Sequence, residues 1–199
     1  MKVLLSALVL AAAPAFAATA VVGQPAPAFS VTDTSGKAVS LADFKGKTVV
    51  LEWVNPGCPY VRKHYDSANM QATQKGAAGQ GVVWLAVNST AQEHGDYKKP
   101  ADMAAWMQSQ KAAATHTLMD SDGKIGKAYG ARTTPHMYIV DAKGTLAYAG
   151  GIDDKPSSNP ADVKTAKNYV NAALGDVLAG KPVAQAVTRP YGCSVKYGD

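Results

Sequence analysis

The sequence predicts a three-layer α/β fold in which helices cover both faces of a central sheet. Strand-like apolar runs alternate with helix-like segments through the middle of the chain, an order typical of parallel strands joined by helical crossovers. Two of these runs, 48–54 and 82–87, are almost continuously apolar, which indicates strands buried on both faces. The segment 136–149 instead contains two strands around the turn Asp141-Ala142-Lys143-Gly144, so we expect a mixed sheet.

Local patterns predict the remaining elements. Glycine and proline punctuate the chain between apolar periodic segments, and these residues mark the expected ends of helices and strands. In the last predicted helix the apolar spacing places Val163, Val170, Leu174 and Leu178 on the inward face. We expect a hairpin over 29–40, a helical turn at 41–44, helices over 59–78, 101–113, 125–129 and 160–179, and a strand over 116–119.

The chain opens with the features of a secretory signal. Lys2 precedes an apolar, alanine-rich run, and Ala15-Phe16-Ala17 has the small-x-small pattern of a cleavage site. The apolar run is too short for a stable membrane span, so we expect a signal peptide over 1–17, cleavage after Ala17 and a periplasmic protein. The length then suits one domain over 22–180, followed by a C-terminal arm over 181–199.

Composition narrows the class of protein. The chain is 47% hydrophobic and 18% charged, which is typical of a globular protein. The net charge is +5 and the pI about 9.1, but the basic residues are dispersed and form no block. We therefore expect no nucleic-acid partner and interpret the charge as solvated surface.

The segment around Cys58 has the pattern of a reactive thiol at the start of a helix. A buried strand ends at Asn55-Pro56-Gly57, and Pro59 is tolerated in a first helical turn. Cys58 should therefore lie near the N-cap, where the positive end of the helix dipole favours a thiolate. The cations of Arg62 and Lys63 should act in the same direction. A thiolate is the attacking form in disulfide exchange and in peroxide reduction.

The run Gly57-Cys58-Pro59-Tyr60-Val61-Arg62 resembles the active-site segment of thioredoxin-fold redoxins, and most closely that of the alkyl hydroperoxide reductase/thiol-specific antioxidant family. The resemblance implies a thioredoxin-like fold with a central mixed sheet and an N-terminal hairpin, and it makes Cys58 the attacking cysteine. Val61 stands where the resolving cysteine of a Cys-x-x-Cys pair would be. Glu52 occupies the place of the buried acid that shuttles the thiol proton in thioredoxins.

A second resemblance involves Thr134 and Pro135, which precede an apolar strand. In the thioredoxin superfamily a Thr-Pro at this place carries a cis proline that faces the active-site cysteine, and the cis form is inexpensive only for proline. The resemblance therefore implies a cis Thr134–Pro135 bond opposite the thiol. We also expect Pro59, Arg132 and His136 to contact the substrate or the thiolate.

The two cysteines, Cys58 and Cys193, leave two interpretations open. In an exported protein such a pair more often forms a disulfide than stays free. As a redox pair, Cys58 attacks a peroxide or a disulfide, and Cys193, on a mobile arm, resolves the product. As a structural staple, the bond would stabilise the fold by about 5 kcal/mol in the chain-entropy model. The reactive setting of Cys58 favours the redox pair.

Departures from the family pattern place general thiol-disulfide exchange ahead of peroxide reduction. Peroxiredoxins resemble one another in Pro-x-x-x-Thr-x-x-Cys, but Leu51 and Asn55 stand at the Pro and Thr places here, and Thr134 stands where their late arginine would be. We predict an exported redoxin that reduces protein disulfides or hydroperoxides, takes electrons from a thioredoxin-like reductant and needs no cofactor or metal.

Two other classes of function remain as alternatives. One is a non-catalytic binding module held together by the disulfide. The other is a copper-binding relative of the redoxins, because soft sulfur with imidazole suits copper. The four histidines have no ligand spacing and the local cysteine pair is absent, which argues against copper.

Overall fold

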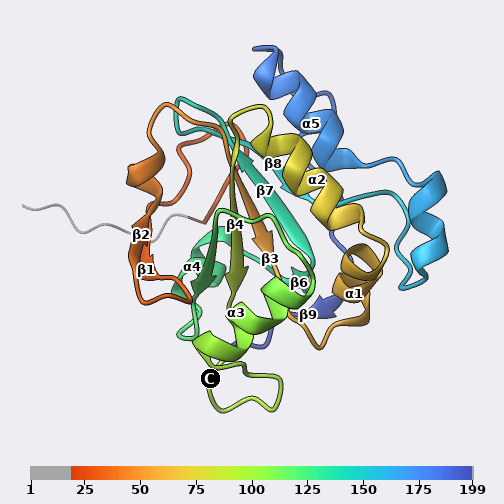
Figure 1. Ribbon diagram of the computed structural model, residues 1–199. Helices are drawn as coiled ribbons and strands as arrows, with labels where there is room; N and C mark the ends of the chain where they lie inside the picture. Colours follow the sequence, from red (N-terminus) through yellow and green to blue (C-terminus); the bar gives the residue numbers. More distant parts are fainter. Residues whose placement is uncertain (1–18, 199) are drawn as a thin grey trace, which may run out of the picture.

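The computed structural model describes residues 19–198, and the expected signal segment lies outside them. Within this range five strands form the central sheet in the order β5-β4-β3-β7-β8 (Figure 1). The first three are parallel, β7 is antiparallel to β3, and β8 is antiparallel to β7, so the sheet is mixed as predicted. The strands are β3 (Val49–Trp53), β4 (Val83–Asn88), β5 (His116–Met119), β7 (His136–Val140) and β8 (Leu146–Gly150).

Helices cover both faces of this sheet. Figure 1 shows α1, α2 and α5 on one side, and α4 with the β1–β2 hairpin on the other. The hairpin is followed by the 3-10 turn η1, whose capping Ser40 accepts a hydrogen bond from Ala42 N. The bounds are β1 (Ser30–Thr32), β2 (Ala38–Ser40), η1 (Leu41–Phe44), α1 (Pro59–Asp66), α2 (Asn69–Ala78), α3 (Pro100–Ser109), α4 (Lys124–Tyr129), η2 (Pro160–Thr165) and α5 (Tyr169–Leu178).

The sheet divides the buried residues into two cores. Along β3 every side chain is buried, and alternate residues point to opposite faces. Val50 and Val54 pack with Cys58 under α1, α2 and α5, whereas Leu51 and Trp53 pack against α4 and the N-terminal hairpin. The continuous apolar pattern of this strand is therefore the consequence of burial on both sides.

The predicted helix over 59–78 is two helices. α1 ends at Asp66, and Ala68 adopts a left-handed conformation with φ of 61° before α2 begins at Asn69. The Asn69 side chain contacts His64 Nδ1 at 2.9 Å across this break. Neither glycine nor proline occupies the break, so the sequence contains no helix-ending residue that would predict it.

The predicted helix over 160–179 is also divided. A 3-10 segment, η2, is followed by extended backbone at Ala166, and α5 starts after Asn168, whose side chain accepts from Asn171 N. Val170 and Leu174 are buried as predicted. Leu178 is 40% exposed, so its predicted inward position is wrong.

The C-terminal arm is extended, as predicted, and it is docked along the domain. Thr188 N donates to Ala149 O at 3.1 Å, and Val195 N donates to Arg132 O at 3.0 Å. Between these contacts β9 (Cys193–Ser194) pairs antiparallel with β6 (Thr133–Thr134). The mobile arm expected from the sequence is thus held on both sides of Cys193.

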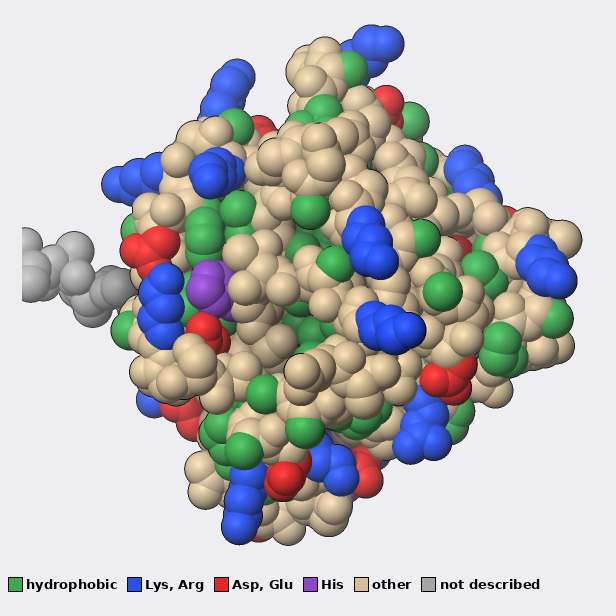
Figure 2. All heavy atoms as spheres, viewed as in Figure 1, with side chains coloured by type: hydrophobic (Ala, Val, Ile, Leu, Met, Phe, Trp, Pro, Cys, Tyr) green, Lys and Arg blue, Asp and Glu red, His purple; other side chains and the backbone are tan. Residues whose placement is uncertain are grey.

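The surface charge follows the dispersed pattern of the sequence. Figure 2 shows Lys and Arg side chains spread singly over this face, with acidic side chains among them. Over residues 19–198 no helix has the length and apolar character needed to cross a membrane.

Candidate redox site

Cys58 occupies the N-cap of α1, as the sequence predicts. Its backbone is extended, with φ of −81° and ψ of 121°, and Pro59 follows at the first helical position. The Cys58 N–H donates to the carbonyl oxygen of Asn55 at 3.0 Å, which closes the turn that ends β3. The Cys58 residue is only 2% exposed, while Pro59 lies on the surface.

The peptide bond between Thr134 and Pro135 is cis, and it faces Cys58. The Cys58 Sγ lies 3.0 Å from the carbonyl oxygen of Thr134. The thiol therefore lies within hydrogen-bonding distance of the residue that precedes the cis proline. The structure thus brings the predicted cysteine, Thr134 and Pro135 into one site.

Cys193 lies at the same site. In the β6–β9 pair Cys193 is opposite Thr134, and its Sγ is 2.8 Å from the Sγ of Cys58. Both cysteines are present as free thiols. Burial, followed by the hydrogen bond and the charge of Cys58, raises the pKa of the Cys193 thiol to about 12. Cys193 therefore stays protonated near neutral pH.

Gly192 allows this close approach of the arm. Its φ of 127° is a conformation that favours glycine, and a Cβ at this position would overlap the carbonyl oxygen of Thr134. A residue with a side chain could not occupy position 192 without displacing β9.

Glu52 is fully buried on the same face of β3 as Val54, in the layer that contains Cys58. Burial raises the pKa of its carboxyl to about 7, although three hydrogen bonds act in the opposite direction. The donors are Trp84 Nε1 at 2.7 Å, Tyr65 OH at 2.9 Å and Gln74 Nε2 at 3.1 Å. The side chain is thus an acid able to exchange a proton near neutral pH.

The structure does not bring His136 and Arg132 to the thiol. His136 lies opposite Trp53 in the β3–β7 pair, and its Nδ1 contacts Tyr138 OH at 3.2 Å. Side chains alternate along β7, so the imidazole points into the core opposite to that of Cys58, and the expected contact with the thiolate is absent. Burial lowers the pKa of His136 to about 4. The Arg132 side chain is exposed.

The two cations of α1 have roles that the sequence did not indicate. Arg62 Nε donates to the carbonyl oxygen of Pro56 at 3.0 Å and so holds the turn before Cys58. Lys63 is buried and donates to the carbonyl oxygen of Lys155 at 2.6 Å. The ammonium group of Lys63 also lies 3.7 Å from Asp153 Oδ2, so it is paired away from the Cys58 sulfur and makes no direct contact with it.

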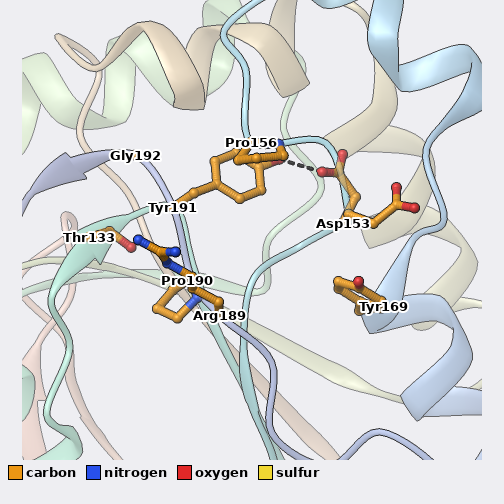
Figure 3. Close-up of a pocket in the computed structure, with 9 residues that line it drawn as sticks. Thr133, Asp153, Pro156, Tyr169, Arg189, Pro190, Tyr191 and Gly192 are labelled. Carbon is orange, nitrogen blue, oxygen red and sulfur yellow. Dashed lines mark hydrogen bonds between the residues drawn. The ribbon is translucent and has the colours of Figure 1, made fainter.

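A cavity of about 540 Å³ adjoins the site. Thr133 of β6 and Gly192 of the arm form part of its wall, together with Asp153, Arg189 and Tyr191 (Figure 3). The cavity therefore lies next to the β6–β9 pair. Among residues 19–198 no three His, Cys, Asp or Glu side chains are grouped so that they could hold a metal ion.

This arrangement defines the class of protein. A mixed sheet of this topology, with a cysteine at a helix start facing a cis proline, makes the chain a thioredoxin-fold redoxin and a thiol-disulfide oxidoreductase. The AhpC/TSA family model matches residues 22–149, and the chain belongs to this family.

Individual relatives agree with this class. The thiol:disulfide interchange protein DsbE of Yersinia pestis is 28% identical over 148 residues, which cover 71% of each chain. The thiol-disulfide oxidoreductase ResA of Bacillus thuringiensis subsp. konkukian is 28% identical over 132 residues, which cover 63% of this chain and 66% of that protein.

A solved structure extends the similarity. Hypothetical protein SMc02350 from Sinorhizobium meliloti 1021 has a TM-score of 0.75 and 25% identity, over 90% of this chain and 96% of its own. This match reaches beyond residue 149, where the family match ends. The similarity therefore includes part of the segment that leads to Cys193.

Proposed function

We propose that this thiol-disulfide oxidoreductase is exported and reduces protein disulfides, with Cys58 as the nucleophile and Cys193 as the resolving cysteine. The observation that carries the proposal is the 2.8 Å separation of the two sulfur atoms beside the cis Thr134–Pro135 bond. The signal-like segment over 1–17 supports export to the periplasm.

The first step is attack by the Cys58 thiolate on one sulfur of the substrate disulfide. A mixed disulfide forms, the substrate S–S bond breaks, and the first substrate thiolate leaves. The raised pKa of Cys193 supports Cys58 as the attacking residue, because Cys193 is protonated near neutral pH. Since Cys58 is buried under the arm, the substrate reaches it only when the arm around Cys193 moves aside.

The second step releases the substrate. Cys193 loses its proton and attacks the Cys58 Sγ; the Cys58–Cys193 bond forms and the second substrate thiolate leaves. Glu52 is the proposed base for this step, because burial raises the pKa of its carboxyl to about 7. A thioredoxin-like dithiol then returns two electrons to the Cys58–Cys193 disulfide.

Hydroperoxide reduction is a second candidate, favoured by membership of the AhpC/TSA family. Cys58 would attack the O–O bond, giving a sulfenic acid and releasing water or an alcohol. Cys193 would then form the disulfide and release water. Leu51, Asn55 and Thr134 occupy the places of the groups that peroxiredoxins share, so we rank this reaction second.

Reductase and peroxidase assays on matched variants test the proposal. We expect Cys58→Ser to abolish insulin-disulfide reduction and any peroxide consumption. Cys193→Ser should stop turnover after the first step and trap a mixed disulfide on Cys58, visible by mass spectrometry. Unchanged turnover without Cys58 would refute the site.

Redox titration separates the catalytic pair from a structural staple. We expect the Cys58–Cys193 disulfide to be reduced at potentials typical of catalytic redoxins, above about −300 mV. A disulfide that stays oxidised until the potential falls below about −300 mV would instead support the disulfide-stapled binding module.

A further inference from the structure

A cluster of ionisable side chains is buried beside the arm. Lys63 and His64 of α1 and Asp153, which follows β8, are each no more than 2% exposed. The Asp153 Oδ2 lies 3.7 Å from Lys63 Nζ and 3.9 Å from His64 Nε2. Lysine and aspartate are almost never fully buried unless they are paired, and removing one partner leaves an uncompensated charge. The cluster therefore depends on complete pairing.

Tyr191 of the arm adds a hydrogen bond to each member of this cluster. Its hydroxyl donates to Asp153 Oδ1 at 2.5 Å, the contact drawn as a dashed line in Figure 3. The hydroxyl oxygen of Tyr191 also lies 3.3 Å from Lys63 Nζ and 3.1 Å from His64 Nε2. One hydroxyl offers one donor and two acceptor sites, so these three contacts saturate it.

The histidine in the cluster has a defined orientation. Its Nδ1 contacts Asn69 Nδ2, a donor, so Nε2 carries the proton and donates to Tyr191. Burial lowers the pKa of His64 to about 4, with the charge of Asp153 raising it and that of Lys63 lowering it. The imidazole is therefore neutral at the pH where the protein would act.

The ring of Tyr191 adds contacts to α1. It packs edge-on against Tyr60 with centroids 5.9 Å apart, and Lys63 Nζ lies 5.3 Å from its centroid. Tyr191 stands two positions before Cys193, with Gly192 between them. The cluster thus fixes the arm directly beside the resolving cysteine.

We propose that Tyr191 is a positioning residue that seats Cys193 against Cys58 through its hydrogen bonds to the buried Lys63, His64 and Asp153 cluster. The inference rests on the redox roles of the two cysteines proposed above. It has two consequences of opposite sign for the reaction. While Tyr191 is seated, access of an external disulfide to Cys58 is blocked, and attack by Cys193 on a mixed disulfide is favoured.

Reaction of the reduced protein with Ellman's reagent, an aryl disulfide, resolves both consequences. In the first phase Cys58 attacks the reagent, one arylthiolate leaves and a mixed disulfide remains on Cys58. In the second phase Cys193 attacks the Cys58 Sγ, the intramolecular disulfide forms and a second arylthiolate leaves. Each arylthiolate is coloured, so stopped-flow absorbance follows both phases. Cys193→Ser identifies the first phase because it removes the second.

Tyr191→Phe keeps the ring and removes the hydroxyl. We expect the first phase to become faster and the second slower, each by about 10-fold to 100-fold, as for lost hydrogen bonds to charged groups. The matched control is Tyr129→Phe. Tyr129 is buried, and its hydroxyl donates to the carbonyl oxygen of Pro27 at 2.9 Å, in the domain and not in the arm. This control should leave both phases unchanged.

Three results would overturn the inference. In the first, the rates of both phases are unchanged in Tyr191→Phe. In the second, both phases become faster in that variant. In the third, the Tyr129→Phe control changes the rates as much as Tyr191→Phe does. Failure of the proposed function has a different signature: release of a single arylthiolate by the unmodified protein would show that Cys193 does not resolve Cys58. The first phase, measured in the Cys193→Ser background, would then still report whether Tyr191 holds the arm over Cys58.

Discussion

Replacing Glu52 by glutamine should make the protein more stable at high pH and leave its stability at low pH nearly unchanged. The buried carboxyl has a pKa of about 7 in place of 4.5, mainly because burial disfavours its charged form. The amide fits the same hydrogen bonds. Its oxygen can accept from Trp84 and Gln74, and its NH₂ can donate to the Tyr65 hydroxyl, which turns to accept.

The sign follows from the direction of the pKa change. The folded state prefers the protonated carboxyl, so this contribution to stability is complete below pH 4.5 and is lost as the pH rises through about 7. A change of this size in pKa corresponds to about 3 kcal/mol in the free energy of unfolding. Glutamine does not ionise, so Glu52→Gln should gain about 3 kcal/mol relative to the unmodified protein between pH 4 and pH 8.

Urea unfolding of the reduced protein at several pH values measures this difference. Other titrating groups, including His64 and His136, alter the free energy of unfolding of both proteins equally, so their contributions cancel in the difference. The matched control is Glu93→Gln, because Glu93 is exposed and should show no such trend. A stability difference that stays constant from pH 4 to pH 8, or that falls with pH, would refute the assignment of a neutral buried Glu52.

Three further predictions concern the arm, the core and the buried carboxyl of Asp33. Gly192→Ala should displace β9 from Thr134 and slow the second phase with Ellman's reagent by at least about 10-fold, whereas an unchanged phase would contradict the close approach. Leu118→Ala should lower the free energy of unfolding by about 2 to 5 kcal/mol in urea, because Leu118 is fully buried. Burial alone would raise the pKa of Asp33, but hydrogen bonds, including one with His116, lower it to about 2. Asp33→Asn should therefore lower the free energy of unfolding at pH 7 and change it little at pH 2. Urea unfolding at both pH values measures this, and an equal loss of stability at pH 7 and pH 2 would exclude this role for Asp33.

Signals that are local in sequence predicted the centre of the site. The apolar run before Asn55-Pro56-Gly57 specified β3, and Pro59 specified the start of α1, so the position of Cys58 followed from neighbouring residues alone. The cis Thr134–Pro135 bond followed from family resemblance. The break at Ala68 did not follow, because alanine favours helix and only tertiary contacts make its left-handed conformation tolerable.

The buried cluster of Lys63, His64 and Asp153 was not predicted, for a different reason. Lys63 and Asp153 are residue types that normally lie in solvent, and no local pattern shows that they meet across the fold. His136 was misplaced because its direction depends on the register of β7 against Trp53 of β3. Register is a property of paired strands, and a single strand sequence does not specify it.

The contacts on either side of Cys193 limit how the arm can open. Thr188 is bonded to Ala149, Val195 to Arg132, and Tyr197 donates to Ala131 at 2.7 Å. If the arm opens without breaking these contacts, only residues 189–194 can move, and they form a short loop between two fixed ends. Loops of about ten residues close in roughly 10 to 100 ns, far faster than thiol chemistry. A displaced Cys193 would return at high effective concentration, so external thiols would have little time to compete for a mixed disulfide on Cys58.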